Sequence, residues 1–196
     1  VLVQHQAVLA AQRACCGAMM LDEDRLIVAG GFNHAGACDT SEVATVTWAF
    51  REEAGHYDLE KVRFSQGPRL AHRRGGCAMA RLDASRALVI GGSDGFSRQR
   101  STEVLHLESM TFSPGPDMGT PRSGSAGAKF HRTKILVAGG LSSGSRGHLD
   151  TTEVLDIERM SFGRGPPMDA MRAYCAAVLH HVPPQAPVPR KDEEPS

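Results

Sequence analysis

The sequence has no excess of one charge and no long apolar run. Lys and Arg together number 22, as do Asp and Glu, so the formal net charge is zero. A balanced charge provides no basic field to attract nucleic acid or an anionic membrane surface. No segment approaches the roughly 20 consecutive apolar residues that a membrane-spanning helix needs. We therefore expect neither nucleic acid nor a membrane as a partner.

Motifs of catalysis and cofactor binding are also missing. The sequence contains no G-x-S-x-G element, no phosphate-binding P-loop and no dinucleotide fingerprint. Nine His residues are scattered without H-x-H or H-E-x-x-H spacing, and no C-x-x-C occurs. We assign no catalytic residue, no metal ligand and no cofactor, and do not expect an enzyme.

What the sequence does contain is an internal repeat. Apolar segments end in a Gly pair three times, as DRLIVAGGF at 24–32, SRALVIGGS at 85–93 and TKILVAGG at 133–140. The tripeptides SEV, TEV and TEV at 41–43, 102–104 and 152–154 keep the same phase. An Arg also precedes each Gly pair at constant spacing, at positions 13, 74 and 122. The repeat unit is roughly 50 residues long.

Each unit predicts four short strands. In the third copy these are a small-residue strand at 122–130, a buried apolar strand at 134–140, an alternating strand at 152–158 and a strand with one aromatic at 159–165. Gly and Pro recur too often for helices. An all-β fold follows, and four strands per unit of roughly 50 residues are typical of a β-propeller blade. We call each unit a blade and its strands A to D.

The phased features resemble the Kelch repeat. In that repeat a Gly pair is followed by a Tyr, by a Trp seven positions later and by a Pro-containing turn before an Arg. Leu105 and Leu155 stand at the Tyr position, Phe112 and Phe162 at the Trp position, and GP-x-M-x-x-x-R follows. The resemblance implies Kelch-type β-propeller blades: three complete four-stranded blades plus the first strand of a fourth, in an incomplete ring.

The repeat also divides the chain. Residues 1–12 are expected to be a lead-in or the end of a preceding blade, and residues 182–196 a disordered, Pro-rich, charged tail. The propeller segment covers 13–181, with complete blades at about 13–70, 71–118 and 119–168 and a partial blade at 169–181. Three interpretations remain open for the missing blades. The chain is a piece of a longer propeller, a homodimer completes a six-bladed ring, or a partner caps the open ends.

The Gly pairs are expected to be structural. They end strand B, where the backbone needs a positive φ or comes close to its neighbour. The residues concerned are Gly30, Gly31, Gly91, Gly92, Gly139 and Gly140. The repeated Glu42, Glu103 and Glu153 are expected to hold a turn in the same way.

Antiparallel strands place the D–A and B–C loops of every blade on one face. In Kelch domains that bind peptides, an Arg at the start of strand A commonly lines the channel mouth and binds acidic groups. By this resemblance Arg13, Arg74, Arg122 and Arg172 would form a ring for a carboxylate- or phosphate-bearing partner. The alternative is that each Arg bonds carbonyls of the neighbouring blade and only positions the turn. Further candidates lie in the B–C loops, namely Arg98, Arg100, Arg146 and His148.

The leading interpretation is a Kelch-type scaffold or adaptor that binds a protein partner, of acidic character, through this loop face. The alternatives are a Kelch-like sugar oxidase or epimerase, or a non-functional fragment of a longer propeller. A copper–tyrosyl site requires paired tyrosines, whereas this chain has only Tyr57 and Tyr174.

Two local features complete the prediction. Cys16, Cys77 and Cys175 each follow a repeat Arg by three residues, as Ser125 does, so they occupy one position on the innermost strand, too far apart for a disulfide or a shared metal. We expect reduced thiols and an intracellular, cytoplasmic setting. The insertion at 44–61 carries Trp48, Phe50 and Tyr57, and is either a second contact surface or a lengthened C–D hairpin.

Overall fold

The computed structural model describes residues 9–52, 55–143 and 147–177. Every regular element in these ranges is a β-strand, and the described residues include no helix that could cross a membrane. The expected lead-in is described only from residue 9 onward. Arg146 and the expected tail at 182–196 lie outside the described residues.

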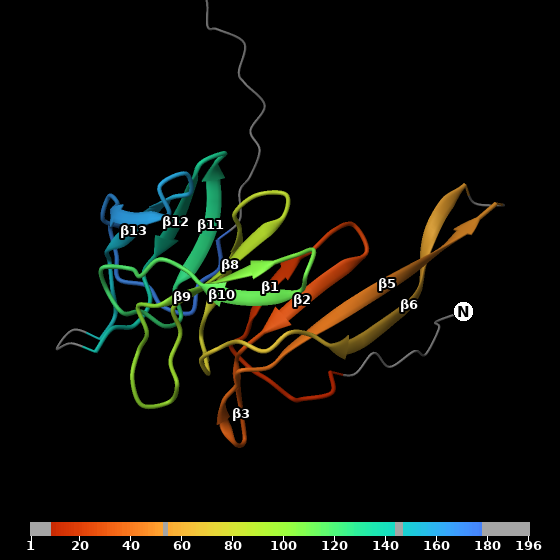
Figure 1. The fold of residues 1–196 in the computed structure, drawn as a ribbon, viewed down its shortest axis with the longest axis horizontal. Coiled ribbons are helices and arrows are strands. Elements are labelled where there is room, and N and C mark those ends of the chain that lie inside the picture. The colour runs from red at the N-terminus through yellow and green to blue at the C-terminus, as the bar shows by residue number, and fades with distance from the viewer. Residues whose placement is uncertain (1–8, 53–54, 144–146, 178–196) are drawn as a thin grey trace, which may run out of the picture.

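Three antiparallel four-stranded sheets form the body of the described chain (Figure 1). The first blade has the order β1 (Gly17–Met20), β2 (Arg25–Ala29), β5 (Ser41–Arg51) and β6 (His56–Gln66). The second has the order β7 (Ala78–Arg81), β8 (Arg86–Ile90), β9 (Thr102–His106) and β10 (Thr111–Pro114). The third has the order β11 (Ala126–His131), β12 (Lys134–Ala138), β13 (Thr152–Asp156) and β14 (Ser161–Arg164). A two-stranded ribbon, β3 (Phe32–Asn33) with β4 (Gly36–Ala37), sits in the B–C loop of the first blade.

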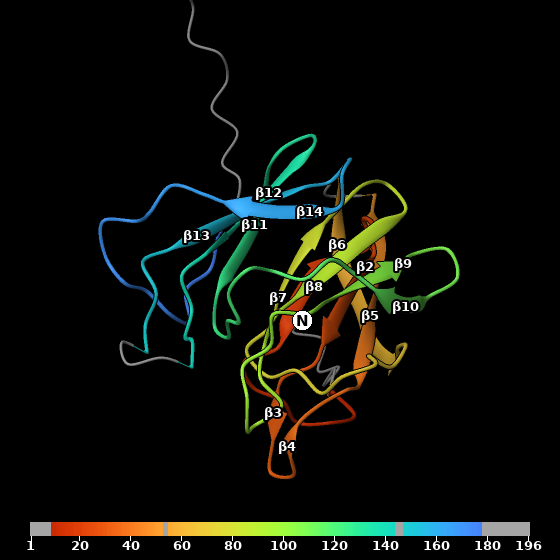
Figure 2. The ribbon, with the colours of Figure 1, turned by 60° about the vertical axis from the view of Figure 1, so that its left-hand side comes forward.

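The predicted all-β class is confirmed, and each complete repeat forms one sheet of four consecutive strands. The described sheets do not close into a ring (Figure 2). The expected first strand of a fourth blade is described only at 169–177, where no strand forms. This segment still makes bonds to the third blade, because Gly140 N–H donates to Arg172 O at 2.7 Å.

Apolar faces pack neighbouring blades together. Ile27, Ala29 and Val43 of the first blade belong to the same buried cluster as Val89 and Leu105 of the second. The opposite face of the second blade packs on the third, in a cluster that contains Leu88, Ile90, Val104, Ile135, Val137 and Leu155. Residues alternate between the faces of a strand, so β8 contributes to both clusters. The second blade is thus covered on both sides.

The outer face of the third blade is open. Leu21 and Leu82 directly follow strand A, Phe130 lies in β11 at the same repeat position, and their exposed fractions are 5%, 0% and 49%. The first two side chains are buried because the next blade covers them. No described blade lies beyond the third, which leaves the Phe130 ring half exposed.

The Gly pairs have the structural role that the sequence predicts. The first Gly of each pair has a positive φ of 60–67°. A Cβ at Gly30, Gly91 or Gly139 would lie 2.2, 2.4 or 2.4 Å from the carbonyl oxygen of the repeat Arg in the next blade. The second Gly donates its N–H to that same oxygen, at 2.7, 2.9 and 2.7 Å for Gly31, Gly92 and Gly140. Both a positive φ and a close approach therefore require glycine here.

Large apolar residues also meet at the expected positions. Phe112 is the cross-strand partner of Leu105, and Phe162 is that of Leu155. Both leucines are fully buried. The insertion in the first blade is a lengthened C–D hairpin, because β5 and β6 are paired from Glu42–Gln66 out to Arg51–His56.

Candidate functional site

All three B–C loops close on a small ladder at one end of the blades. The residue after each Gly pair bridges to the residue after the repeat Arg, as Phe32 to Ala14, Ser93 to Gly75 and Leu141 to Ser123. The same residue bridges forward across its loop, as Phe32 to Ala37, Ser93 to Arg98 and Leu141 to His148. In the first blade this ladder is β3–β4, labelled in Figure 2. Arg98 and His148 therefore occupy the same position in successive blades.

The D–A loops lie against these B–C loops. Arg74 N–H donates to Cys38 O at 2.9 Å, Arg122 N–H to Gln99 O at 3.1 Å and Arg172 N–H to Leu149 O at 3.0 Å. The D–A loop that leads into each repeat Arg thus rests on the B–C loop of the preceding blade. Both kinds of loop share one face, as the strand order predicts, and we call this the loop face.

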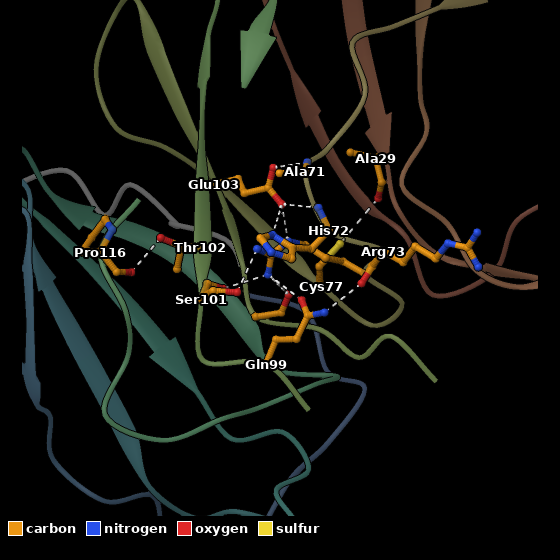
Figure 3. A network of polar contacts seen from close by, with 12 residues as sticks. Ala29, Ala71, His72, Arg73, Cys77, Gln99, Ser101, Thr102, Glu103 and Pro116 are labelled. Atoms are coloured by element: carbon orange, nitrogen blue, oxygen red, sulfur yellow. Dashed lines mark hydrogen bonds and ion pairs between the residues drawn. The ribbon is translucent and has the colours of Figure 1, made fainter. Parts of the chain in front are cut away.

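All the hydrogen bonds that the Arg74 side chain donates go to acceptors in its own blade. Its guanidinium is fully buried and its Nε donates to Glu103 Oε1 at 2.8 Å (Figure 3). Nη1 donates to the carbonyl oxygens of Gly91 at 2.9 Å and Ser101 at 2.8 Å, and to Gln99 Oε1 at 2.8 Å. Nη2 donates to Ser101 Oγ at 3.0 Å. A buried cation is tolerated because a carboxylate and several carbonyl dipoles surround it.

The first and third blades repeat this arrangement. In each, the buried guanidinium binds the repeat Glu, the carbonyl of the first Gly of the pair and the carbonyl that precedes strand C. The contacts are Arg13 to Glu42 at 2.8 Å, Gly30 O at 2.8 Å and Thr40 O at 2.9 Å, and Arg122 to Glu153 at 3.0 Å, Gly139 O at 2.8 Å and Thr151 O at 3.0 Å.

These contacts correct the expectation of an open arginine ring. The side chains of Arg13, Arg74 and Arg122 are 0% exposed, so no external anion reaches their guanidinium groups in this structure. The alternative, that each Arg positions a turn, fits the contacts with one change: the bonded carbonyls belong to the same blade. Arg172 differs, since it is exposed.

Each repeat Glu clamps the loop that enters its blade. Glu42 accepts the N–H groups of Ala10 at 2.6 Å and Ala11 at 3.1 Å, and Glu103 and Glu153 accept two successive loop N–H groups in the same way. Burial acts to raise the pKa of Glu42, but the Ala10 N–H, the Arg13 guanidinium and the Ala11 N–H outweigh it, so the pKa lies below its ordinary value. The expected turn-holding role of these glutamates is confirmed.

The loop candidates differ in availability. Arg98 is partly buried, and its Nε is buried with no hydrogen-bond partner among the described residues. Arg100 is exposed and pairs with Asp117 at 3.0 Å. His148 is exposed at the stem of the third loop. Arg146 cannot be placed because it lies outside the described residues.

Sequence reasoning missed two residues of the loop face. Arg73 directly precedes Arg74 in the chain, but its side chain is exposed and points away from Glu103 and Ser101 in Figure 3. Phe96 is fully exposed at the tip of the second loop. The only sequence signal for either residue is that it lies in a loop that varies between repeats.

Four of the five free cysteines line one hollow of about 240 Å³ beside the innermost strands. Cys16, Cys77 and Cys175 meet there with Ser125, which fits their single repeat position. Burial raises the pKa of the Cys77 thiol to about 11, so it is a poor nucleophile at neutral pH. Within the described ranges, no three His, Cys, Asp or Glu side chains are placed to hold a metal ion.

Comparison with known proteins adds no identification. A scan of the chain against protein-family models and a search of curated proteins both find no match. The geometry therefore defines the class by itself: an all-β repeat protein whose sheets present varied loops on one face.

Proposed function

We propose that this chain is a segment of a Kelch-type propeller and acts as a protein-binding module through its loop face. The observation that carries the proposal is the shared ladder of the three B–C loops. Equivalent positions on this ladder hold Ala37, Arg98 and His148, of which Ala37 is buried, so one backbone frame carries a different side chain in each blade. Varied side chains on a constant frame are typical of recognition surfaces.

The proposed partner carries acidic groups, and the residues that would bind it are revised. The proposed binding cations are Arg73, Arg98 and Arg172 instead of the buried arginines. Arg73 and Arg172 are exposed, and the Nε of Arg98 has no hydrogen-bond partner among the described residues. Phe96 supplies an apolar contact at a loop tip. An Arg guanidinium in such a place forms bidentate hydrogen bonds with a carboxylate or phosphate.

A labelled poly-glutamate peptide of about ten residues tests this proposal by fluorescence anisotropy at low salt, where exposed charges are least screened. We expect the double variant Arg73→Ala with Arg98→Ala to raise the dissociation constant at least about fivefold. The matched control is Arg63→Ala with Arg132→Ala, which removes two exposed cations from the opposite end of the blades. Absence of binding, or equal weakening by both double variants, contradicts the proposal.

A further inference from the structure

The lengthened hairpin of the first blade has one apolar face and one polar face. Its outer cross-strand pairs Trp48–Leu59 and Phe50–Tyr57 alternate with the polar pair Arg51–His56 and with Ala49–Asp58. Paired residues point to the same side of a sheet, and the side changes with each step along the strand. Trp48, Phe50, Tyr57 and Leu59 therefore share one face, which we call the hairpin face.

The hairpin face is exposed to solvent and held in place. The exposed fractions of Trp48, Phe50, Tyr57 and Leu59 are 48%, 53%, 67% and 52%. The Phe50 and Tyr57 rings contact each other with centroids 5.0 Å apart, and Trp48 Nε1 donates to Asp24 Oδ1 at 3.0 Å. Large exposed apolar patches on an ordered surface generally mark an interaction site.

Packing between blades does not explain this patch. The C–D hairpins of the other two blades end at the pairs His106–Thr111 and Asp156–Ser161, whereas β5 and β6 continue to Arg51–His56. In Figure 1 the outer half of β5 and β6 projects beyond the body of the three sheets. A neighbouring blade of ordinary size would not cover it.

We propose that the hairpin face binds the hairpin face of a second copy of this chain, about a two-fold axis. Aromatic side chains present roughly 150–250 Å² each, so the three that are about half exposed, together with Leu59, offer on the order of 400 Å² per copy. Two copies would bury on the order of 800 Å² of these side chains, which is the size of a weak, reversible interface. A two-fold axis brings the same surface of both copies together, which suits a face whose outer part is formed by aromatic side chains and a leucine.

Charge also favours a second copy. Arg51, His56 and Asp58 lie on the reverse face, where Arg51 and His56 each bind Asp58 at 3.1 Å. One carboxylate, that of Asp24, touches the hairpin face at its inner edge, where it accepts the Trp48 Nε1–H, so a two-fold pairing must hold the two Asp24 groups apart at the ends of the interface. The formal net charge of zero adds no repulsion between whole chains.

Sedimentation velocity of the full chain, from about 1 to about 100 μM, tests the proposal. The test variant is Phe50→Thr with Tyr57→Thr, which keeps β-forming residues in both strands. The control is Phe96→Thr, because Phe96 is fully exposed on the loop face, away from the hairpin. We expect dimers for the original chain and the control, and at least about a tenfold higher dissociation constant for the test variant.

A second readout uses the only Trp of the chain. Dimer formation would bury Trp48 and shift its emission to shorter wavelength as concentration rises, without any substitution. A chain that stays monomeric, an emission that is constant with concentration, or a dimer that persists in the test variant overturns the proposal. Loss of the dimer in Phe130→Thr, with the test variant still dimeric, would instead assign the contact to the open face of the third blade.

Discussion

At the scale of single residues, the blade depends on a buried ion pair. Arg74 reaches Glu103 and the carbonyls on both sides of the B–C loop with one side chain. It therefore ties strand A, the loop and strand C together. Breaking such a pair is costly because the remaining charge stays buried without a partner.

Arg74→Ala should lower the free energy of unfolding by about 3–5 kcal/mol, because Glu103 and several carbonyls would lose their donor. Arg73→Ala is the control, since Arg73 is exposed and should cost no more than about 0.5 kcal/mol. Urea unfolding followed by circular dichroism measures both variants. A loss below about 1 kcal/mol for Arg74→Ala would show that the pair does not hold the blade.

The first Gly of each pair is required for two separable reasons, its positive φ and the short distance to the backbone of the next blade. Gly91 and Gly147 have φ of 60° and 63°, but a Cβ meets Arg122 O at 2.4 Å only at Gly91. Gly147→Ala should cost only the positive-φ term of about 1–2 kcal/mol. Gly91→Ala should cost clearly more, since it also pushes the next blade away. Equal losses in urea unfolding would contradict the close approach as the reason for the Gly pair.

The Glu42 carboxylate should make the free energy of unfolding depend on pH in the acid range. Its pKa in the folded chain lies below the ordinary value of 4.5, so its stabilising effect is complete above pH 4.5 and is lost as the pH falls through the folded pKa. Urea midpoints of the original chain and Glu42→Gln, measured from neutral to acid pH, should therefore converge below pH 4.5. A constant difference down to low pH would contradict this assignment.

At the scale of elements, strand C also anchors the turn that leads to the next blade. Thr102 Oγ1 donates to Pro116 O at 2.8 Å, and Ser41 and Thr152 donate to the Pro carbonyl at the same repeat position at 2.6 Å. The Ser or Thr that precedes each repeat Glu therefore makes the same hydrogen bond to the Gly-Pro turn in all three blades.

Thr102→Val should lower the free energy of unfolding by about 1–2 kcal/mol, because the Pro116 carbonyl would lose its donor while the shape is kept. Thr111→Val is the control, since Thr111 is exposed on β10. Thermal unfolding compares the two. A larger loss in the control than in Thr102→Val would contradict the role of this contact.

The elements were largely predictable and the role of the repeat Arg was not. Gly pairs, apolar runs and the phased tripeptides mark strands B and C directly, because glycine and alternation report on local backbone. Arg74 and Glu103 are 29 residues apart, so nothing local shows that they meet. The sequence did contain a signal for this ion pair, because one Arg and one Glu recur at the same position in every repeat. The exposure of Phe96 depends on how its loop folds, and no sequence pattern indicates it.

At the scale of the whole molecule, the three blades pack face to face in chain order, with the second covered on both sides. The second blade packs on both neighbours, whereas Phe130 on the third is left 49% exposed. In stacked repeats each unit is stabilised mainly by its neighbours, so end units open more easily than the middle. The repeat arginines are buried within the blades and form no open ring.

Hydrogen–deuterium exchange of the intact chain, read by mass spectrometry, tests whether the second blade is the most stable of the three. The predicted result is slowest exchange in β8, between the two buried clusters, and faster exchange in β2 and β12, whose blades each pack on one described neighbour. Exchange that is slowest in β2 or β12, or equal in all three strands, would contradict the stacked arrangement.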